Sequence, residues 1–513
     1  MARTPLMDLL NRTLRDSQRT ESASPADSRF MTRRTALTLG AAGLLLPLMG
    51  SRAYAQPTSM QLPALADSGR QARVVVVGAG VAGLHCAYRL QQAGAQVDVY
   101  EASERTGGRV FSARGIFAQD QVAELGGELI NSDHVVMRGL AQEFGLALDD
   151  RHVLTSGLHA ETIVVDGSPV HHDHLVEAWR PVARQMRRDV RRMSEAQLDT
   201  HSIASWLDSL DELDPVLRTV IELAYVAEFG AELGEQTLLN LRYLIDFSRG
   251  RHFRVLGDSN ERYHTHAGND AITTALTNAL SAPVHHMHWL RRISQTAAEA
   301  YELEFESPSG MVTVAADVVV LAIPQTTMRD VELNISEFPE LKRRSIHEVQ
   351  YGRNSKLMSQ YSRRVWAVDH QASGTTYVSG ALGTGWDSTV GQSGDMGIWT
   401  NYVGGRLADL HNEGTPVEKW AGLVGQLELA YPGVSAAYTG QAIRFHWPTS
   451  PHQRGSWLVY GPGQMSEFWG CEGQPVGRLF FCGEHTSLEQ QGYMEGAAES
   501  GLRAAREVRA LLM

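Results

Sequence analysis

The sequence contains few cysteines and no apolar run long enough to cross a membrane. Three cysteines among 513 residues cannot form a disulfide framework. We interpret Cys86 and Cys482 as small core residues, because each lies in an apolar pattern. The apolar run from Ala36 to Met49 has 14 residues and contains Pro47, so it is too short to span a bilayer. A disulfide-rich scaffold and a stable membrane span are therefore not expected.

Positive charge is also scarce in most of the chain. The net charge is −12, and residues 1–55 carry eight arginines against four acidic residues, which leaves −16 for the remainder. An acidic surface argues against nucleic acid as a partner and favours cationic substrates. With 43% hydrophobic residues, the chain can bury a large core and form two domains.

Residues 1–55 have the pattern of a targeting signal. Arg33 and Arg34 precede the apolar run, and residues 53–55 read Ala-Tyr-Ala, a small-x-small cleavage pattern. The paired arginines predict export of the folded protein by the twin-arginine pathway, to the periplasm or out of the cell. An ordinary secretory signal with a chance arginine pair is the alternative. The mature chain is expected to begin near Gln56, with the exact cleavage site open, and Met31 is an alternative start.

The most informative stretch lies between Arg73 and Arg109. Four consecutive valines at 74–77, bounded by glycine, predict a buried parallel strand. The pattern then predicts a helix over 81–93 and a second strand over 96–100. A G-x-G-x-x-G motif separates the first strand from the helix, and its glycines are Gly78, Gly80 and Gly83.

Each glycine of this motif has its own task in a dinucleotide-binding fold. Gly78 permits a tight turn, Gly80 lets the backbone approach a pyrophosphate, and Gly83 lets the helix pack on the strand. The helix N-terminus offers N–H groups and a positive dipole end to the phosphates. Glu101, after the second strand, can accept hydrogen bonds from a ribose. Together these features predict a dinucleotide site.

Two segments identify the kind of dinucleotide. Residues 101–109 read E-x-x-x-R-x-G-G-R, and residues 478–505 contain a strand, a Gly-Glu-His-Thr turn and a helix start near Gly492. Both resemble motifs of the flavin-dependent amine oxidase superfamily, which includes monoamine oxidases, polyamine oxidases and L-amino-acid oxidases. The resemblance extends over residues 72–510 and implies FAD, not NAD, as the cofactor.

The resemblance also assigns cofactor contacts to residues of the first two segments. It implies that Arg109 helps to hold FAD and that the segment with Gly126 and Gly127 passes the flavin ring. It further implies that the backbone of Leu290 touches the adenine end.

The C-terminal motif supplies the remaining implied contacts. Glu484, which follows Gly483, matches the acid that binds the ribityl chain, and the helix start at Met494 matches N–H donors to the flavin pyrimidine edge. Ser456 stands where covalently flavinylated relatives carry cysteine. A non-covalent FAD is therefore expected.

The same resemblance predicts how a substrate is held. Glu128 and Asn131 are expected to face the substrate. Trp457 and Tyr493 match the two rings of an aromatic cage, with plain core packing as the alternative. Lys356 matches a lysine that is hydrogen-bonded through a water to flavin N5. Its rarity supports a special role, since only three of the 46 lysines and arginines are lysines, and a desolvated lysine can manage protons as arginine cannot.

Two histidine clusters raise the question of a metal site. Residues 171–174 read His-His-Asp-His between proline and glycine signals, which predicts a surface loop. Residues 285–288 read His-His-Met-His and fit a strand over 284–293. Neither cluster has a second group of ligands at metal-binding spacing, so no metal is expected.

The sequence thus predicts an α/β fold. A Rossmann-like FAD-binding domain is assembled from separated segments, beside an α+β substrate domain with a mixed sheet and a helical subdomain. Periodicity of 3.6 residues over 169–249 predicts that subdomain, with Trp179 and Trp206 in its core. The expected order is a signal over 1–55, FAD-binding segments over 72–135, 256–330 and 448–513, a helical subdomain over 136–255 and a substrate sheet over 331–447.

These features predict an FAD oxidase that converts an amine to an imine and reduces O₂ to hydrogen peroxide. Water then hydrolyses the imine to an aldehyde or ketone. The resemblance also favours monoamines or polyamines over amino acids. L-amino-acid oxidases of the superfamily usually place an arginine shortly after the paired glycines to bind the carboxylate, and residues 128–131 contain none.

Several alternatives remain open at this point. An L-amino-acid oxidase could use Arg353, or an arginine of the helical subdomain, as its carboxylate clamp. A flavin dehydrogenase would pass electrons to a partner instead of O₂, and a flavin-binding protein without activity would show no flavin bleaching. The expected partners are an amine or amino acid and O₂, with a homodimer as one option for an oligomeric state that the sequence leaves open.

Overall fold

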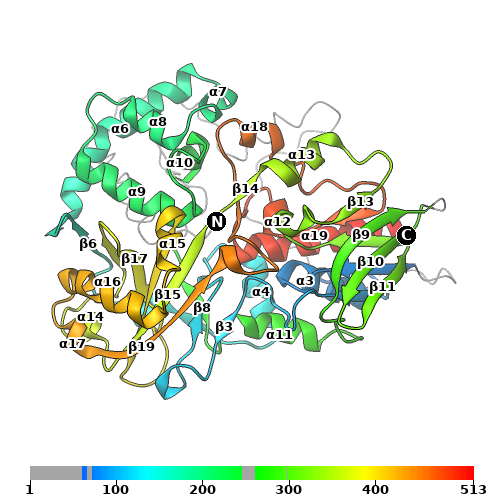
Figure 1. Cartoon of the computed structure of the whole chain (residues 1–513), viewed down its shortest axis with the longest axis horizontal. Helices are drawn as coiled ribbons and strands as arrows, with labels where there is room; N and C mark the ends of the chain where they lie inside the picture. The colour runs from blue at the N-terminus through cyan, green and yellow to red at the C-terminus, as the bar shows by residue number, and fades with distance from the viewer. Residues whose placement is uncertain (1–59, 66–71, 245–259, 297–298) are drawn as a thin grey trace.

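A computed structural model describes residues 60–65, 72–244, 260–296 and 299–513 (Figure 1). The predicted signal over residues 1–55 and the cleavage site near Gln56 lie outside the described residues. The remaining chain forms two sheet regions at opposite ends of the molecule, with the C-terminal helix crossing toward the end that holds the first strands (Figure 1).

One sheet is parallel and joins chain segments that are far apart in sequence. Its strand order is β2-β1-β12-β21, with all three pairings parallel. The strands span Gln96–Tyr100 (β2), Arg73–Val77 (β1), Val318–Leu321 (β12) and Leu479–Phe481 (β21). This arrangement confirms the predicted α/β fold with a parallel sheet.

The valine run of β1 is buried on both faces of this sheet. Val74 and Val76 pack on the side of helix α3 (Val81–Gln92) and helix α19 (Met494–Leu512). Val75 and Val77 pack on the other side, against a second sheet. A strand covered on both faces needs apolar side chains in both directions, which explains why the run does not alternate.

The second sheet has the order β11-β10-β9-β13. Its strands are Gly310–Ala316 (β11), Tyr301–Ser307 (β10), Trp289–Gln295 (β9) and Glu332–Asn334 (β13). The predicted strand over 284–293 was wrong at its start, because β9 begins only at Trp289. His285 forms an isolated bridge with Tyr100, on which its ring stacks at 4.5 Å between centroids, so tertiary packing replaces the extended strand.

A seven-stranded mixed sheet lies at the other end of the molecule. Its order is β19-β15-β18-β17-β16-β6-β7, with β16 and β6 parallel and the other pairs antiparallel. Its strands are Tyr438–His446 (β19), Asn354–Tyr361 (β15), Gly397–Gly404 (β18), Gly383–Asp387 (β17), Thr376–Val378 (β16), Thr162–Val165 (β6) and Ser168–Pro169 (β7). All residues of β15 are buried, and they include Lys356. This strand therefore places a lysine side chain in the interior.

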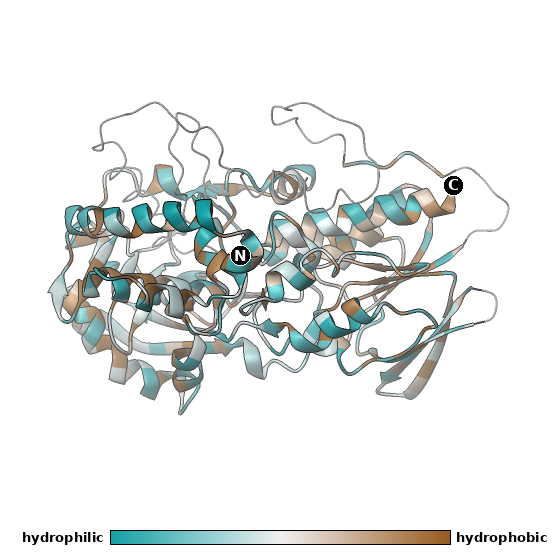
Figure 2. Cartoon of the chain, turned by 90° about the horizontal axis from the view of Figure 1, so that it is seen from above, coloured by the Kyte–Doolittle hydropathy of each residue, from teal (hydrophilic) through white to brown (hydrophobic). Residues whose placement is uncertain are grey.

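Helices cover this sheet on one side, at the upper left of Figure 1. They are α6 (His172–Arg192), α7 (Glu195–Asp199), α8 (Ile203–Asp208), α9 (Pro215–Phe229) and α10 (Leu238–Leu244). Trp179 and Trp206 are buried in their common core, as predicted. Teal and brown residues alternate along the helices in Figure 2, as expected of helices with one buried face.

The prediction of a surface loop at residues 171–174 was wrong. His171 is the N-cap residue of α6, and the helix begins at His172. His174 approaches Asp214 at 3.3 Å, so its partner is a carboxylate of a neighbouring helix start. Within the described ranges, no group of three His, Cys, Asp or Glu side chains is arranged to hold a metal ion. A search of the same residues for a long apolar helix suited to crossing a bilayer found none.

Candidate active site

A single long cavity runs from the glycine turn after β1 to the mixed sheet. Every site residue predicted from the sequence lines this cavity, with the exception of Gly83. It contains about 1740 Å³ of space out to its open mouth. Its lining extends from the glycine turn of the parallel sheet to Lys356 of the mixed sheet, so it offers room at both ends.

The three glycines of the turn differ in what surrounds them. Gly78 has φ +103°, and a Cβ there would lie 2.7 Å from the backbone oxygen of Ala322. A Cβ on Gly83 would lie 1.9 Å from the backbone oxygen of Gly78, so this residue sits against the turn and not in the cavity. Gly80 lines the cavity, and nothing lies within 4 Å of its Cβ position. The space at Gly80 is thus open to a ligand.

Glu101 lies beside this turn and has protein partners of its own. Its Oε2 accepts a hydrogen bond of 2.7 Å from the Ala79 backbone N–H, and its Oε1 accepts from the backbone N–H and the hydroxyl of Ser103. The carboxylate therefore fixes the glycine turn. Two carboxylate oxygens offer about four acceptor sites, so a ribose hydroxyl could still bind. Leu290 of β9 lines the same end of the cavity.

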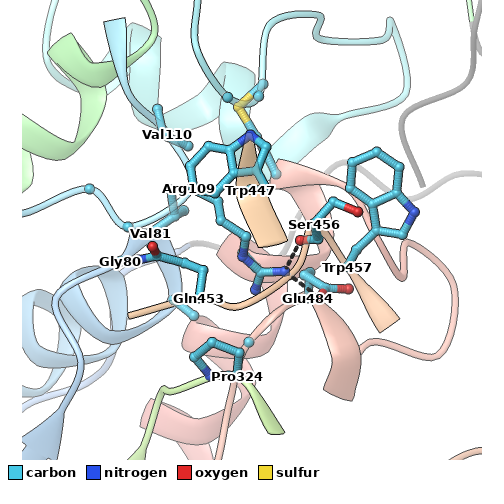
Figure 3. A pocket seen from close by; sticks show the side chains of 18 of the residues that line it. Gly80, Val81, Arg109, Val110, Pro324, Trp447, Gln453, Ser456, Trp457 and Glu484 are labelled. Atoms are coloured by element: carbon cyan, nitrogen blue, oxygen red, sulfur yellow. Dashed lines mark hydrogen bonds and ion pairs between the residues drawn. The ribbon is translucent and has the colours of Figure 1, made fainter. Parts of the chain in front are cut away.

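An ion pair joins the first and last parts of the chain near the middle of the cavity (Figure 3). Arg109 donates to Glu484 at 2.8 Å and also to the backbone oxygen of Ser456. The second carboxylate oxygen of Glu484 accepts from the Gly492 backbone N–H at 2.8 Å. Gly483, with φ +139°, turns the chain so that Glu484 points inward.

Helix α19 starts at this point. Its N-cap residue is Tyr493, which makes no side-chain capping bond, and Met494 and Tyr493 both line the cavity. The Met494 side chain lies so close to Gly127 that a Cβ there would be 2.8 Å from its Cγ and Sδ atoms. Gly126 is equally constrained, since its Cβ would lie 1.9 Å from the Arg109 backbone oxygen. Small residues are thus required where these segments meet.

Lys356 and Glu128 form a buried ion pair at the mixed-sheet end. The ammonium donates to Glu128 Oε2 at 2.7 Å and to the backbone oxygens of Glu124 and Gly126 at 2.9 Å each. Lys356 is 4% exposed and Glu128 7% exposed. Protein acceptors therefore take all three ammonium protons.

Two donors hold the other oxygen of Glu128. The indole N–H of Trp386 and the hydroxyl of Ser388 each donate to Oε1 at 2.9 Å. Burial alone would raise the pKa of Glu128, but the Lys356 charge and hydrogen bond, with Arg151 and Trp386, bring this pKa below its ordinary value. The side chain is consequently a carboxylate at neutral pH.

Aromatic rings form the walls beside this pair. Trp457 packs against Trp386 and Tyr402, whose ring centroids are 5.4 Å apart. Tyr493 meets the ring of His134 edge-on at 5.0 Å. The Tyr402 hydroxyl is buried and has no hydrogen-bond partner among the described residues. Burial also raises the pKa of this phenol well above its usual value, so it stays protonated.

Trp386 and Tyr402 were not predicted as site residues. They belong to β17 and β18, which pair beside the strand that carries Lys356, and Tyr402 lies opposite Lys356 in register. An alternating pattern in strands near a predicted catalytic lysine could have drawn attention to them. The pairing order of the sheet, however, is not readable from the sequence.

Arg353 does not supply a carboxylate clamp. It pairs with Glu235 and Asp409, each at 3.3 Å, and it is not among the residues that line the cavity. Among the described lining residues, Arg109 is the only arginine, and Glu484 already pairs with it. The suggestion that an arginine of the helical subdomain reaches the cavity is therefore also wrong for the described residues.

Rarity alone does not distinguish Lys356 from the other lysines. Lys342 is 3% exposed, donates to the Glu472 backbone oxygen at 2.8 Å and lies 3.7 Å above the ring centroid of Phe481. Burial lowers the pKa of Lys342 to about 8. Lys419 is partly exposed beside Glu413 at 3.9 Å. Lys356 differs from both by its position in the cavity and by its ion pair with a buried carboxylate.

Residues 81–509 match the protein-family model that is described as "Flavin containing amine oxidoreductase". The chain belongs to this family. It is thus a flavin-dependent oxidase of amines or amino acids.

Curated relatives resemble the chain over most of its length. A putative L-amino-acid oxidase, YobN, of Bacillus subtilis (strain 168) is 24% identical over 475 residues, which cover 87% of this chain and 96% of that protein. An L-amino-acid oxidase of Gloydius halys is 25% identical over 478 residues, covering 85% and 88%.

Solved structures share the fold at lower identity. Cyclohexylamine oxidase from Brevibacterium oxydans IH-35A superposes with a TM-score of 0.73 at 21% identity, covering 86% of this chain and all of that one. Wild-type putrescine oxidase bound to putrescine gives 0.72 at 19% identity, covering 86% and 99%.

The residues of the cavity fit a flavin cofactor. Neither α3 nor α19 has a side-chain cap on its first N–H groups, and both helices begin at the cavity. Unsatisfied N–H groups at a helix start favour anionic oxygen atoms. The start of α3, with Gly80, suits a pyrophosphate, and the start of α19 suits a ring edge on which negative charge collects.

We expect Gly83→Ala and Gly80→Ala to separate folding from cofactor binding. The added methyl group at Gly83 meets a backbone oxygen, so flavin-free protein should lose about 1–3 kcal/mol of stability. The methyl group at Gly80 meets only open space, so stability should hold while flavin affinity falls at least about tenfold, or ~1.4 kcal/mol. Thermal melts of flavin-free protein and flavin titrations measure the two effects. Equal melting temperatures for both variants would contradict the assignment.

Proposed function

We propose that this protein is an FAD-dependent oxidase of monoamines or polyamines. When bound, FAD would supply the redox chemistry, a two-electron oxidation of the C–H beside nitrogen with O₂ as the final acceptor and hydrogen peroxide as its product. The imine product hydrolyses to an aldehyde or ketone and releases ammonia or an amine. The observation that carries the proposal is the charge balance of the cavity, where Lys356 and Arg109 are each paired with a carboxylate.

Charge balance decides between the two classes of substrate. A carboxylate brought into a buried site needs an unpaired cation or several donors, because its desolvation otherwise costs several kcal/mol. Among the described lining residues, both strong cations are already compensated. A neutral amine needs no such compensation, and the ionised Glu128 disfavours a second carboxylate nearby.

The aromatic walls have a separate task. Trp457, Trp386 and Tyr402 form an apolar cluster that excludes water and favours the deprotonated amine, which is the reactive form. Tyr493, at the start of α19, extends this wall toward the cofactor end of the cavity. These rings would orient the C–H bond of the substrate by shape.

A second candidate is an L-amino-acid oxidase. The buried Tyr402 hydroxyl has no described partner and could donate to a substrate carboxylate. The curated relatives with the names of L-amino-acid oxidases are compatible with this alternative. The buried indole N–H of Trp457 is a second donor without a described partner, but two neutral donors are a weak replacement for an arginine clamp.

A substrate panel with a Tyr402→Phe variant tests the choice. We expect peroxide from cyclohexylamine or putrescine with a kcat/KM at least about tenfold above that for any L-amino acid, a difference of ~1.4 kcal/mol. The variant should change amine oxidation by less than about threefold, whereas loss of a carboxylate bond would cost ~1.5–3 kcal/mol. Selective loss of amino-acid oxidation would support the second candidate. Flavin reduction without peroxide in air would indicate a dehydrogenase.

The cofactor is expected to be held without a covalent bond. Ser456 donates its hydroxyl to the Gly352 backbone oxygen and to Asn354, and Cys86, Cys471 and Cys482 are buried away from the cavity lining. No thiol among the described lining residues can thus form a thioether. Acid or heat should release intact FAD into the supernatant, measured by its absorbance and chromatography. Yellow colour that stays with the precipitated protein would refute this expectation.

The segment before Gln56 is proposed as a twin-arginine export signal. A pathway that carries folded proteins suits a chain whose cofactor site needs strands from three distant segments. Arg33→Lys combined with Arg34→Lys should stop export and leave flavin-loaded, active protein in the cytoplasm. Fractionation with activity assays checks this, and Arg29→Lys serves as the matched control. Undiminished export of the double variant would point to the general secretory route.

A further inference from the structure

The two buried lysines of this chain are held in different ways. Lys342 donates to one backbone oxygen and lies over an aromatic ring, and burial lowers its pKa to about 8. Lys356 is buried to the same extent but has three acceptors, one of them the carboxylate of Glu128. The described surroundings of Lys356 therefore contain a full set of partners for a positive charge.

The number of acceptors specifies the protonation state of Lys356. An ammonium donates three hydrogen bonds, whereas a neutral amine donates two and must accept at its lone pair. The backbone oxygens of Glu124 and Gly126 and the Oε2 atom of Glu128 are acceptors, at 2.9, 2.9 and 2.7 Å. Only the ammonium satisfies all three.

The number of hydrogen-bond donors around Glu128 likewise specifies its protonation state. Its Oε1 faces the indole N–H of Trp386, which can donate but cannot accept, and the hydroxyl of Ser388. The Ser388 hydroxyl also bonds to that of Thr400 at 2.6 Å. Both oxygens of Glu128 are thus filled by donors from β15, β17 and the residue that follows β17.

We propose that Glu128 is a positioning residue that keeps Lys356 as a fixed ammonium in the cavity. Glu128 is then not a substrate ligand, although its place after the paired glycines suggests one. Lys356 in turn serves as a permanent positive charge and not as a proton acceptor. The proposal goes beyond the proposed function, because it holds for an amine or an amino-acid substrate alike.

Other charged groups face this pair and belong to the same balance. Arg151, which begins α5 (Arg151–Leu154), helps to lower the pKa of Glu128. The Glu124 carboxylate turns away from Lys356 toward His264 and Ser112. Glu261 lines the cavity. Burial first, and then the charges of Glu228 and Glu261, raise the pKa of Tyr402, the residue opposite Lys356. None of these groups lies between the Lys356 ammonium and the Glu128 carboxylate, which are in direct contact.

The small number of lysines makes a direct test practical. Flavin-loaded protein labelled with ¹⁵N and ¹³C at lysine should give three side-chain signals, assigned with Lys419→Arg and Lys342→Arg variants. At about pH 9, below the ordinary lysine value of about 10.4, Lys356 should give an ammonium signal with slowly exchanging protons. Lys342 should be mainly neutral there, since its pKa is about 8. A neutral Lys356 amine at this pH would overturn the proposal without any variant.

Variants of Glu128 provide the second arm of the test. Glu128→Leu removes both the charge and the acceptor oxygen, which leaves two acceptors for Lys356, and it should abolish the Lys356 ammonium signal at about pH 9, because an opposite charge in contact favours the charged form. Glu128→Asp should restore the signal at least in part. Glu413→Gln, beside Lys419, is the matched control and should leave the Lys356 signal unchanged. An ammonium signal that persists in Glu128→Leu contradicts the proposal, whereas failure of the amine panel with these signals intact would contradict only the substrate assignment.

Discussion

The Arg109–Glu484 ion pair is the contact on which assembly of the site depends. Arg109 ends the first cofactor motif, and Glu484 lies in the last, 375 residues further along the chain. The Arg109 side chain also donates a hydrogen bond to the backbone oxygen of Ser456. The Arg109 backbone oxygen lies so close to Gly126 that no Cβ would fit there. Because Glu484 is buried, loss of its partner would leave an uncompensated charge at a cost of about 3–5 kcal/mol. Arg109 thus connects its own segment with the three segments that contain Gly126, Ser456 and Glu484.

Two ion pairs lie at different places along the cavity. Arg109–Glu484 fixes the segments beside the start of α19, and Lys356–Glu128 fixes the glycine segment against β15. In both cases the charges compensate each other before any ligand enters. The remaining electrostatic influence on a ligand therefore comes mainly from the helix starts and the aromatic faces.

The sequence predicted the local features of this site better than its long-range contacts. The glycine turn and the C-terminal helix start are recognisable because each is a short stretch whose backbone needs particular residues. Trp386 and Tyr402 were missed, because their nearness to Lys356 depends on the order of strands in a seven-stranded sheet. The histidines at 171–174 and 285–288 were misplaced because a helix start and a packed ring overrode the local pattern.

Glu128 illustrates the physical limit of such predictions. Its motif fixes where its backbone lies, but the partner of its carboxylate is 228 residues away, in the seven-stranded sheet. Relatives named for amine oxidation and for amino-acid oxidation share this chain's fold or sequence, so the fold cannot decide which substrate is used. The decision rests on how many charges in the cavity are left uncompensated. In the described cavity Lys356 and Arg109 both have carboxylate partners, so a substrate carboxylate would need neutral donors such as the Tyr402 hydroxyl or would have to displace one of those partners.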